Sequence, residues 1–150
     1  MKRFLIVASV GAALAIGGPA YAMTDAECAT LWTKADANKD GVVTESEARQ
    51  YFAALRVRDK PVTDGKMTQT VFLEHCKAGH LTTASTEPGA PLPGSNSFTE
   101  AQAIDRVLAA GLGNISSLKK DPDGIWRGTA SDGAKTVNVA VDYKGHVVAQ

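Results

Sequence analysis

The stretch "DANKDGVVTESE", residues 36–47, decides how the first half of the chain folds. Side chains with oxygen atoms stand at its first, third and fifth positions, a glycine follows at the sixth, and a glutamate ends it at the twelfth. Glycine at the sixth position allows the backbone a left-handed turn that other residues adopt only with strain. The residues that set this pattern are Asp36, Asn38, Asp40, Gly41 and Glu47.

This spacing predicts a calcium site. Calcium prefers six to eight oxygen ligands, and a 12-residue loop supplies them from positions 1, 3, 5, 7, 9 and 12. At position 7 the backbone carbonyl would serve, at position 9 a hydroxyl would act directly or through a water, and the final glutamate would bind through both oxygens. A hydrated polar turn without metal would not need glycine and glutamate at these offsets. The expected ligands are Asp36, Asn38, Asp40, Val42, Thr44 and Glu47.

Amphipathic helices are expected on both sides of this loop. Residues 24–27, "TDAE", form a capping box, and apolar residues then recur at helical spacing as Cys28, Leu31, Trp32 and Ala35. After the loop the same spacing recurs as Ala48, Tyr51, Phe52 and Leu55. The loop and its two helices resemble the EF-hand family, whose pattern D-x-[DN]-x-[DN]-G-x5-E the sequence matches. The resemblance implies calcium binding, and Val43 should point into the core.

A second loop, within residues 59–72, should not bind calcium. Alignment of "DGKMT" on "DGVVT" puts Asp64 at position 5, but positions 1, 3 and 12 become Lys60, Val62 and Val71. None of these three supplies a carboxylate. The short spacing to the first loop predicts that the helix entering this second hand is missing. Val43 and Met67 are expected to pair across a short antiparallel bridge.

The two cysteines are expected to form a disulfide. A third helix over residues 69–77 would pack against the first and bring Cys76 toward Cys28. Two buried free thiols are the alternative, although an even count in an exported chain favours the bond. The run "EHCKAGH" also suggests zinc or copper at His75, Cys76 and His80. We disfavour that metal site, because Cys76 is better used in the disulfide and a fourth ligand is not apparent.

Residues 1–22 have the form of a secretory signal peptide. Two basic residues, Lys2 and Arg3, precede an apolar run, and "AYA" supplies small residues for cleavage after Ala22. We therefore expect a secreted, periplasmic protein with no membrane span after cleavage. The chain has 16 basic and 16 acidic residues, so it lacks the basic excess of a nucleic-acid-binding protein.

The rest of the chain divides into residues 23–80 as the EF-hand domain, 81–97 as a linker, and 98–150 as a second domain. Residues 82–97 are rich in proline and small polar residues, which is typical of a flexible linker. A capping box at 99–102 opens a helix, and short strands with "DPDG" and "DG" turns follow. We expect an α+β fold, helical in the first half, with a helix and an antiparallel sheet in the second. The inward helix positions would be Ala101, Ile104, Val107 and Leu108.

The second domain resembles the PepSY family, on the basis of "LKKDPDGIWRGTA" (118–130) and "VDYKGHVVA" (141–149). That resemblance implies a module that binds or restrains a protein partner and carries no agreed catalytic residues. No nucleophile, base and orienting group stand out together, so we do not expect an enzyme. Calcium would act as a signal or buffer that changes how the module meets its partner. Alternatively, calcium is a structural staple in a periplasmic protease inhibitor or envelope-protein binder.

Overall fold

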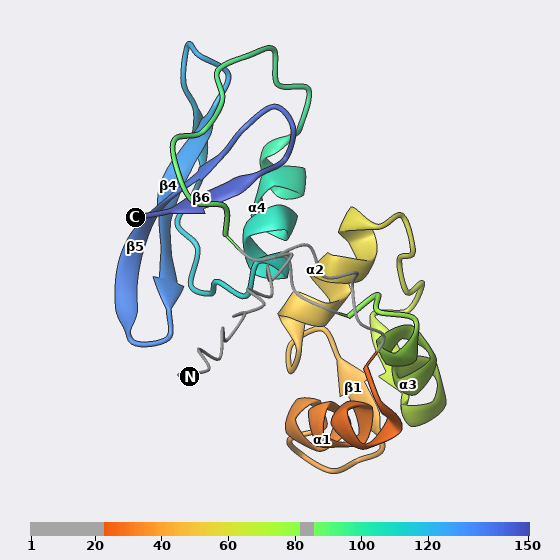
Figure 1. Ribbon diagram of the computed structural model, residues 1–150. Coiled ribbons are helices and arrows are strands. Elements are labelled where there is room, and N and C mark those ends of the chain that lie inside the picture. The colour runs from red at the N-terminus through yellow and green to blue at the C-terminus, as the bar shows by residue number, and fades with distance from the viewer. Residues whose placement is uncertain (1–22, 82–85) are drawn as a thin grey trace, which may run out of the picture.

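The protein has an α+β fold (Figure 1). The computed structural model describes residues 23–81 and 86–150, so the expected signal peptide, residues 1–22, lies outside the described residues. Helices dominate the first half, and a sheet with strand order β3-β4-β5-β6 fills the second. The elements are α1 (Asp25–Ala35), β1 (Val42–Thr44), α2 (Arg49–Val57), β2 (Lys66–Thr68), α3 (Gln69–Lys77), α4 (Glu100–Ala109), β3 (Lys119–Lys120), β4 (Trp126–Asp132), β5 (Lys135–Val141) and β6 (Val147–Ala149).

The first helix begins where the sequence predicts. Thr24 caps α1 by accepting a hydrogen bond from the Glu27 amide at 3.3 Å, and the Glu27 carboxylate accepts one from the Thr24 amide at 2.8 Å. This reciprocal pair satisfies two of the amides that a helix start leaves without partners. The same arrangement at Thr99 and Gln102 opens α4. Both capping boxes are confirmed.

Phe72 lies at the centre of the first half's core. Its ring meets the rings of Trp32 and Tyr51 edge to face, each at a centroid distance of 5.4 Å. Edge-to-face pairs of this kind add to the stabilisation from burial alone. The bridge between β1 and β2 closes the core from the loop side, because Val43 pairs with Met67 and both side chains are fully buried. The expected pairing and the inward position of Val43 are confirmed.

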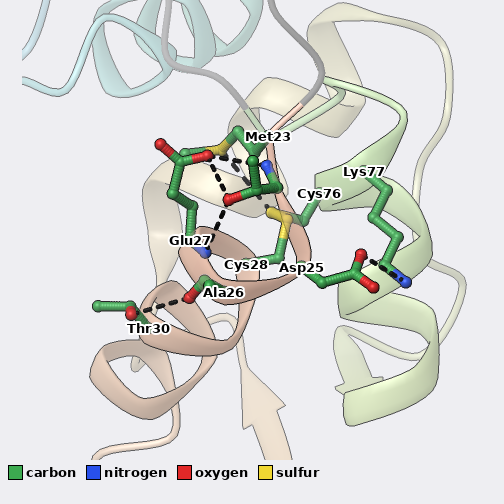
Figure 2. Close-up of a disulfide and its surroundings, with 9 residues drawn as sticks. Met23, Asp25, Ala26, Glu27, Cys28, Thr30, Cys76 and Lys77 are labelled. Atoms are coloured by element: carbon green, nitrogen blue, oxygen red, sulfur yellow. Dashed lines mark hydrogen bonds and ion pairs between the residues drawn. A yellow bond between two sulfur atoms is a disulfide. The ribbon is translucent and has the colours of Figure 1, made fainter.

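A disulfide joins α1 to α3. Cys28 and Cys76 are bonded with a Cα–Cα distance of 5.8 Å, and both are fully buried (Figure 2). Figure 2 also shows Asp25 facing Lys77, an ion pair of 2.9 Å between the same two helices. The sequence predicted both the bond and the packing of α3 on α1 from one helical face, and both are confirmed.

Helix α4 packs on one face of the four-stranded sheet. Val139 and Val141 of β5 share a buried cluster with Ala103 and Val107 of α4. The expected inward position of Ala101 is wrong, because Ala101 is exposed and Ala103 is buried in its place. The buried face of α4 is therefore shifted around the helix, toward the side that also meets α2.

The strand expected before the "DPDG" turn is regular only at Lys119–Lys120. The residues before it still run beside β4, through backbone hydrogen bonds that link Gly113 with Ser131 and the Ser116 amide with the Thr129 carbonyl. Asn114, at the start of this stretch, has a positive φ of 44°, which departs from the extended backbone of a strand.

Residues 86–97 are not the flexible connection that their composition predicts. The Glu87 amide donates to the Val147 carbonyl at 2.7 Å, and the Gly94 amide donates to the Asp123 carbonyl at 2.9 Å. Asn96 is buried. The segment is thus ordered by its backbone hydrogen bonds to the strands and turns, and large apolar side chains are not needed for this. Residues 82–85 of the expected linker lie outside the described residues.

Asp142 fixes this segment to the turn between β5 and β6. Its carboxylate is 1% exposed and accepts hydrogen bonds from the amides of Leu92, Lys144 and His146 and from the His146 ring. Burial alone would raise the pKa of Asp142, but these hydrogen bonds stabilise the ionised form more strongly, so the pKa is lowered. The carboxylate is therefore an ionised anchor at neutral pH.

Replacement of Asp142 by asparagine should destabilise the protein at pH 7 by about 2 kcal/mol, the usual cost of losing hydrogen bonds to a charged group. Because the folded-state pKa lies below the unfolded value, this stability is present above the unfolded pKa and is lost as pH falls through the folded pKa. Urea unfolding between pH 3 and pH 7 measures the effect. Wild type and Asp142→Asn should converge at the acid end; a difference that stays constant across this range would contradict the assignment.

Candidate metal centre

Asp36 organises the start of the loop that connects α1 to β1. It is the C-cap of α1, its amide donates to the Trp32 carbonyl at 2.8 Å, and its side chain is buried. The carboxylate accepts hydrogen bonds from the amides of Asp40 at 3.1 Å and Gly41 at 3.2 Å. The loop therefore curls around the carboxylate of its first residue.

The middle of the loop is a series of tight turns. The Asn38 side-chain oxygen accepts from the Asp40 amide, and the Asp40 carboxylate accepts from the Val42 amide, each at 2.9 Å. Lys39 and Gly41 both have left-handed backbones, with φ of 61° and 82°. A Cβ atom on Gly41 would meet no described residue within 4 Å, so backbone conformation, and not crowding, is the reason for glycine there.

Glu47 closes the loop with its two carboxylate oxygens in different environments. Oε2 accepts from the Thr44 amide at 2.9 Å and from the Thr44 hydroxyl at 2.7 Å. Oε1 is buried and has no hydrogen-bond partner among residues 23–81 and 86–150. A buried carboxylate oxygen without a partner is costly, because burial removes its hydration and no hydrogen bond replaces it. A positively charged or donating group at this oxygen would remove that cost.

The six predicted ligands all lie on this one loop. Across residues 23–81 and 86–150, no group of three or more acidic, histidine or cysteine side chains is arranged to hold a metal ion. The acidic and amide side chains instead accept hydrogen bonds from loop amides. Their oxygens nevertheless remain on the same short loop, and the chemistry of the set, carboxylates with an amide and a hydroxyl, fits a hard cation.

The second loop brings no comparable set together. Between the first loop and β2, α2 is the one helix that the described residues contain, so the expected loss of a separate entering helix is confirmed. The loop joins the first through the strand bridge and through a 3.1 Å hydrogen bond from the Glu45 amide to the Gly65 carbonyl. It acts as a structural brace for the first loop.

Helix α2 links the loop to the second half of the protein, as Figure 1 shows by its position beside α4. Small residues on both helices, Ala53 and Ala54 on α2 and Ala109 on α4, form a buried cluster with Leu108. Small side chains permit two helices to approach closely. The halves are therefore packed against each other.

Arg56 is a functional candidate that the sequence analysis missed. From α2 its guanidinium binds both oxygens of Asp105 on α4, at 2.8 and 2.6 Å, and also Glu45 of the loop at 2.8 Å. The hydrogen bond to Asp105 is the main reason that the pKa of Arg56 rises above its usual value. No local pattern indicates this bridge, since Arg56 and Asp105 are 49 positions apart.

A cavity of about 220 Å³ lies where the loop meets the second half. Glu47 and Gln50 line it from one side, and Leu112 and Asn114 line it from the other. The closing residue of the loop thus borders the segment that follows α4. A change in the position of Glu47 can therefore act directly on that segment.

Comparisons of the chain with models of protein families, with curated proteins and with solved structures found no match. No helix within the described parts of the chain is long and apolar enough to cross a membrane. The function must therefore be argued from the loop and its surroundings.

Proposed function

We propose that the protein is an exported calcium-binding protein whose second half meets a protein partner, with calcium held by the loop of residues 36–47. One observation carries the proposal: Oε1 of Glu47, buried and without a partner in the described part of the chain, stands at the position where such a loop needs a two-oxygen ligand. The positive charge of an ion would stabilise that oxygen. The disulfide between Cys28 and Cys76 fits an oxidising compartment.

The proposed ligands follow the loop in order: the side-chain oxygens of Asp36, Asn38 and Asp40, the Val42 carbonyl, the Thr44 hydroxyl or a water next to it, and both oxygens of Glu47. Three of these groups are carboxylates, and the second loop offers no partner site for cooperative binding. We therefore expect a modest dissociation constant of about 10⁻⁵ to 10⁻³ M, as in weaker sensors and extracellular modules.

Calorimetric titration of the purified protein with calcium tests the proposal. The expected result is one site per chain in this affinity range. A nanomolar constant would contradict the ligand count, and two sites would contradict the assignment of the second loop. No heat together with no change in thermal stability at millimolar calcium would reject the proposal as a whole.

The packing of the halves supports a role for calcium beyond the loop itself. Glu45 of the loop, Arg56 of α2 and Asp105 of α4 form a continuous chain of ion pairs. All three side chains are partly exposed, so these ion pairs contribute little to the free energy of folding. Their main effect is to fix the geometry between the loop, α2 and α4. An ion that reshapes the loop would shift Glu45 and thereby bias the contact between α2 and α4.

Replacement of Arg56 by methionine should separate calcium binding from its effect on α4. In the wild type, calcium should slow amide hydrogen exchange in both α2 and α4. In Arg56→Met the slowing should persist in α2 and fall at least twofold in α4, because the bridge to Asp105 is lost. Exchange followed by mass spectrometry measures this. Arg127→Met, which removes the ion pair between β4 and Asp121, is the matched control.

The alternative, in which calcium has only a structural role, is tested by the same experiment. If calcium slows exchange in α2 alone in the wild type, the ion only stabilises its own loop. Capture of periplasmic proteins on the immobilised protein, with calcium or with a chelator, extends the test to the partner. Capture that depends on calcium supports a signalling role for the ion. Capture that is equal in both conditions supports a purely structural role.

A further inference from the structure

Two histidines are brought together where α3 ends. Gly79 follows the C-cap with a left-handed backbone, φ 71°, so the chain reverses over the last turn of the helix. The Gly79 amide donates to the Cys76 carbonyl and the His80 amide to the His75 carbonyl, each at 2.9 Å. This pair of bonds is the Schellman motif, in which the second residue after the cap lies over the third helical residue before it. Residues 75 and 80 occupy those two positions.

Buried anchors on both sides hold this pair in place. Cys76, next to His75, is fully buried in the disulfide, and Leu81, next to His80, is 1% exposed in the core. The backbone of each histidine is therefore fixed by its neighbour and by the hydrogen bonds of the motif. Both imidazole rings are half-buried and remain in reach of solvent.

The two rings present a chelating pair of nitrogen atoms. Their Nδ1 atoms lie 3.1 Å apart, with ring centroids 5.4 Å apart and the ring planes inclined at 51°. A metal ion bound at the usual 2.0–2.1 Å from each nitrogen would see them at an angle of about 100°, between the square-planar and tetrahedral values. Burial, followed by the nearby His80 and Lys60, lowers the pKa of His75, so its lone pair is available at neutral pH.

We propose that His75 and His80 form a second metal site, a two-nitrogen chelate for a divalent transition-metal ion that prefers imidazole, with Cu²⁺ bound more tightly than Zn²⁺. Water fills the remaining coordination positions. The order of affinities follows the general preference of nitrogen ligands among these ions. Calcium is excluded, because it requires oxygen ligands that this site lacks. The site is independent of the proposed calcium loop. A bound ion would hold His80 against the last turn of α3.

The sequence alone disfavours a metal here, because Cys76 is better used in the disulfide and a fourth ligand is not apparent. In the structure Cys76 is bonded to Cys28, and the two imidazoles provide the chelate without it. The signal in the sequence is the glycine directly before the second histidine. Gly79 is what returns His80 to His75.

Titration of the tag-free, full exported chain with Cu²⁺ and Zn²⁺ tests the site by calorimetry. We expect one tight equivalent, with Cu²⁺ tighter than Zn²⁺. His75→Gln and His80→Gln should each lower the affinity by about 100-fold, because loss of one nitrogen turns a chelate into a single contact. His146→Gln is the matched control, since that ring pairs with Asp142 and should leave the titration unchanged. Equal binding by all three variants would overturn the proposal.

A measurement on the unaltered protein guards against variants that fail to fold. In the nitrogen NMR spectrum of the histidine rings, one equivalent of Zn²⁺ should shift the Nδ1 signals of His75 and His80 together and leave those of His146 in place. Shifts at His146 alone, or no shift at all, would reject the site whatever the variants show.

Discussion

Replacement of Glu47 by glutamine is expected to lower calcium affinity by about 100-fold. Glutamine keeps the size of the side chain and can still accept hydrogen bonds from Thr44, but it removes the negative charge and one of the two ligand oxygens. An interaction of a charged group with a hydrogen-bonding partner contributes about 1.5–3 kcal/mol, and an ion that depends on both oxygens should lose at least that much. Calcium titration calorimetry measures the change.

Glu47→Gln should also change the thermal stability of the protein, because it replaces the carboxylate whose Oε1 is buried. In calcium-free buffer the variant should unfold at the same temperature as the wild type or slightly higher, since it no longer buries an unpartnered carboxylate oxygen. In millimolar calcium the order should reverse. A variant that is less stable in both buffers would show that Glu47 acts in folding alone.

Asp64→Asn is the matched control for this experiment. It removes one carboxylate from the position of the second loop that corresponds to Asp40, and the side chain is exposed. Because that loop has no other carboxylate at its expected ligand positions, calcium affinity should stay within twofold of the wild type. A loss of calcium affinity as large as that of Glu47→Gln would show that the ion binds the second loop.

Removal of the disulfide is expected to be the largest change in stability. The bond closes a loop with a sequence separation of 48 and limits the freedom of the unfolded chain, which is worth about 4 kcal/mol in the chain-entropy model. The double variant Cys28→Ala/Cys76→Ala should therefore melt about 10–15 °C lower than the oxidised wild type. Differential scanning calorimetry measures the shift.

Reduction gives the control for the double variant. A strong reductant should lower the melting temperature of the wild type to nearly that of the variant and should leave the variant unchanged. Asp25→Asn, which removes the exposed ion pair with Lys77 between the same helices, should have little effect by comparison. A wild type that melts at the same temperature with and without reductant would contradict the assigned role of the bond.

Features encoded by local patterns could be predicted from the sequence. The helix over residues 24–35 follows from its capping box and apolar spacing, and the Cys28–Cys76 bond follows because both residues lie on apolar helix faces. The pairing of Val43 with Met67 follows from the alignment of the two loops on their glycines. The six calcium ligands also come from spacing alone, and they stay a prediction.

Features that depend on distant pairs could not be predicted. Ala53 and Ala54 appeared unremarkable in the sequence, because small residues gain meaning only when another helix approaches them closely. Composition predicts that residues 86–97 are flexible, because it counts apolar side chains and does not include backbone amides that find hydrogen-bond partners on a sheet. Arg56 needed its two partners in place before its role as a bridge could be seen.

The decisive experiment is a calcium titration of the full protein followed by backbone amide NMR. We expect amides of residues 36–47 to shift first and most, shifts also to reach α4 and residues 112–114, and all of them to saturate at one equivalent per chain. Amides of residues 60–65 in the second loop should move little. Shifts centred on that second loop, or no shift in residues 36–47 at millimolar calcium, would contradict the proposed calcium site.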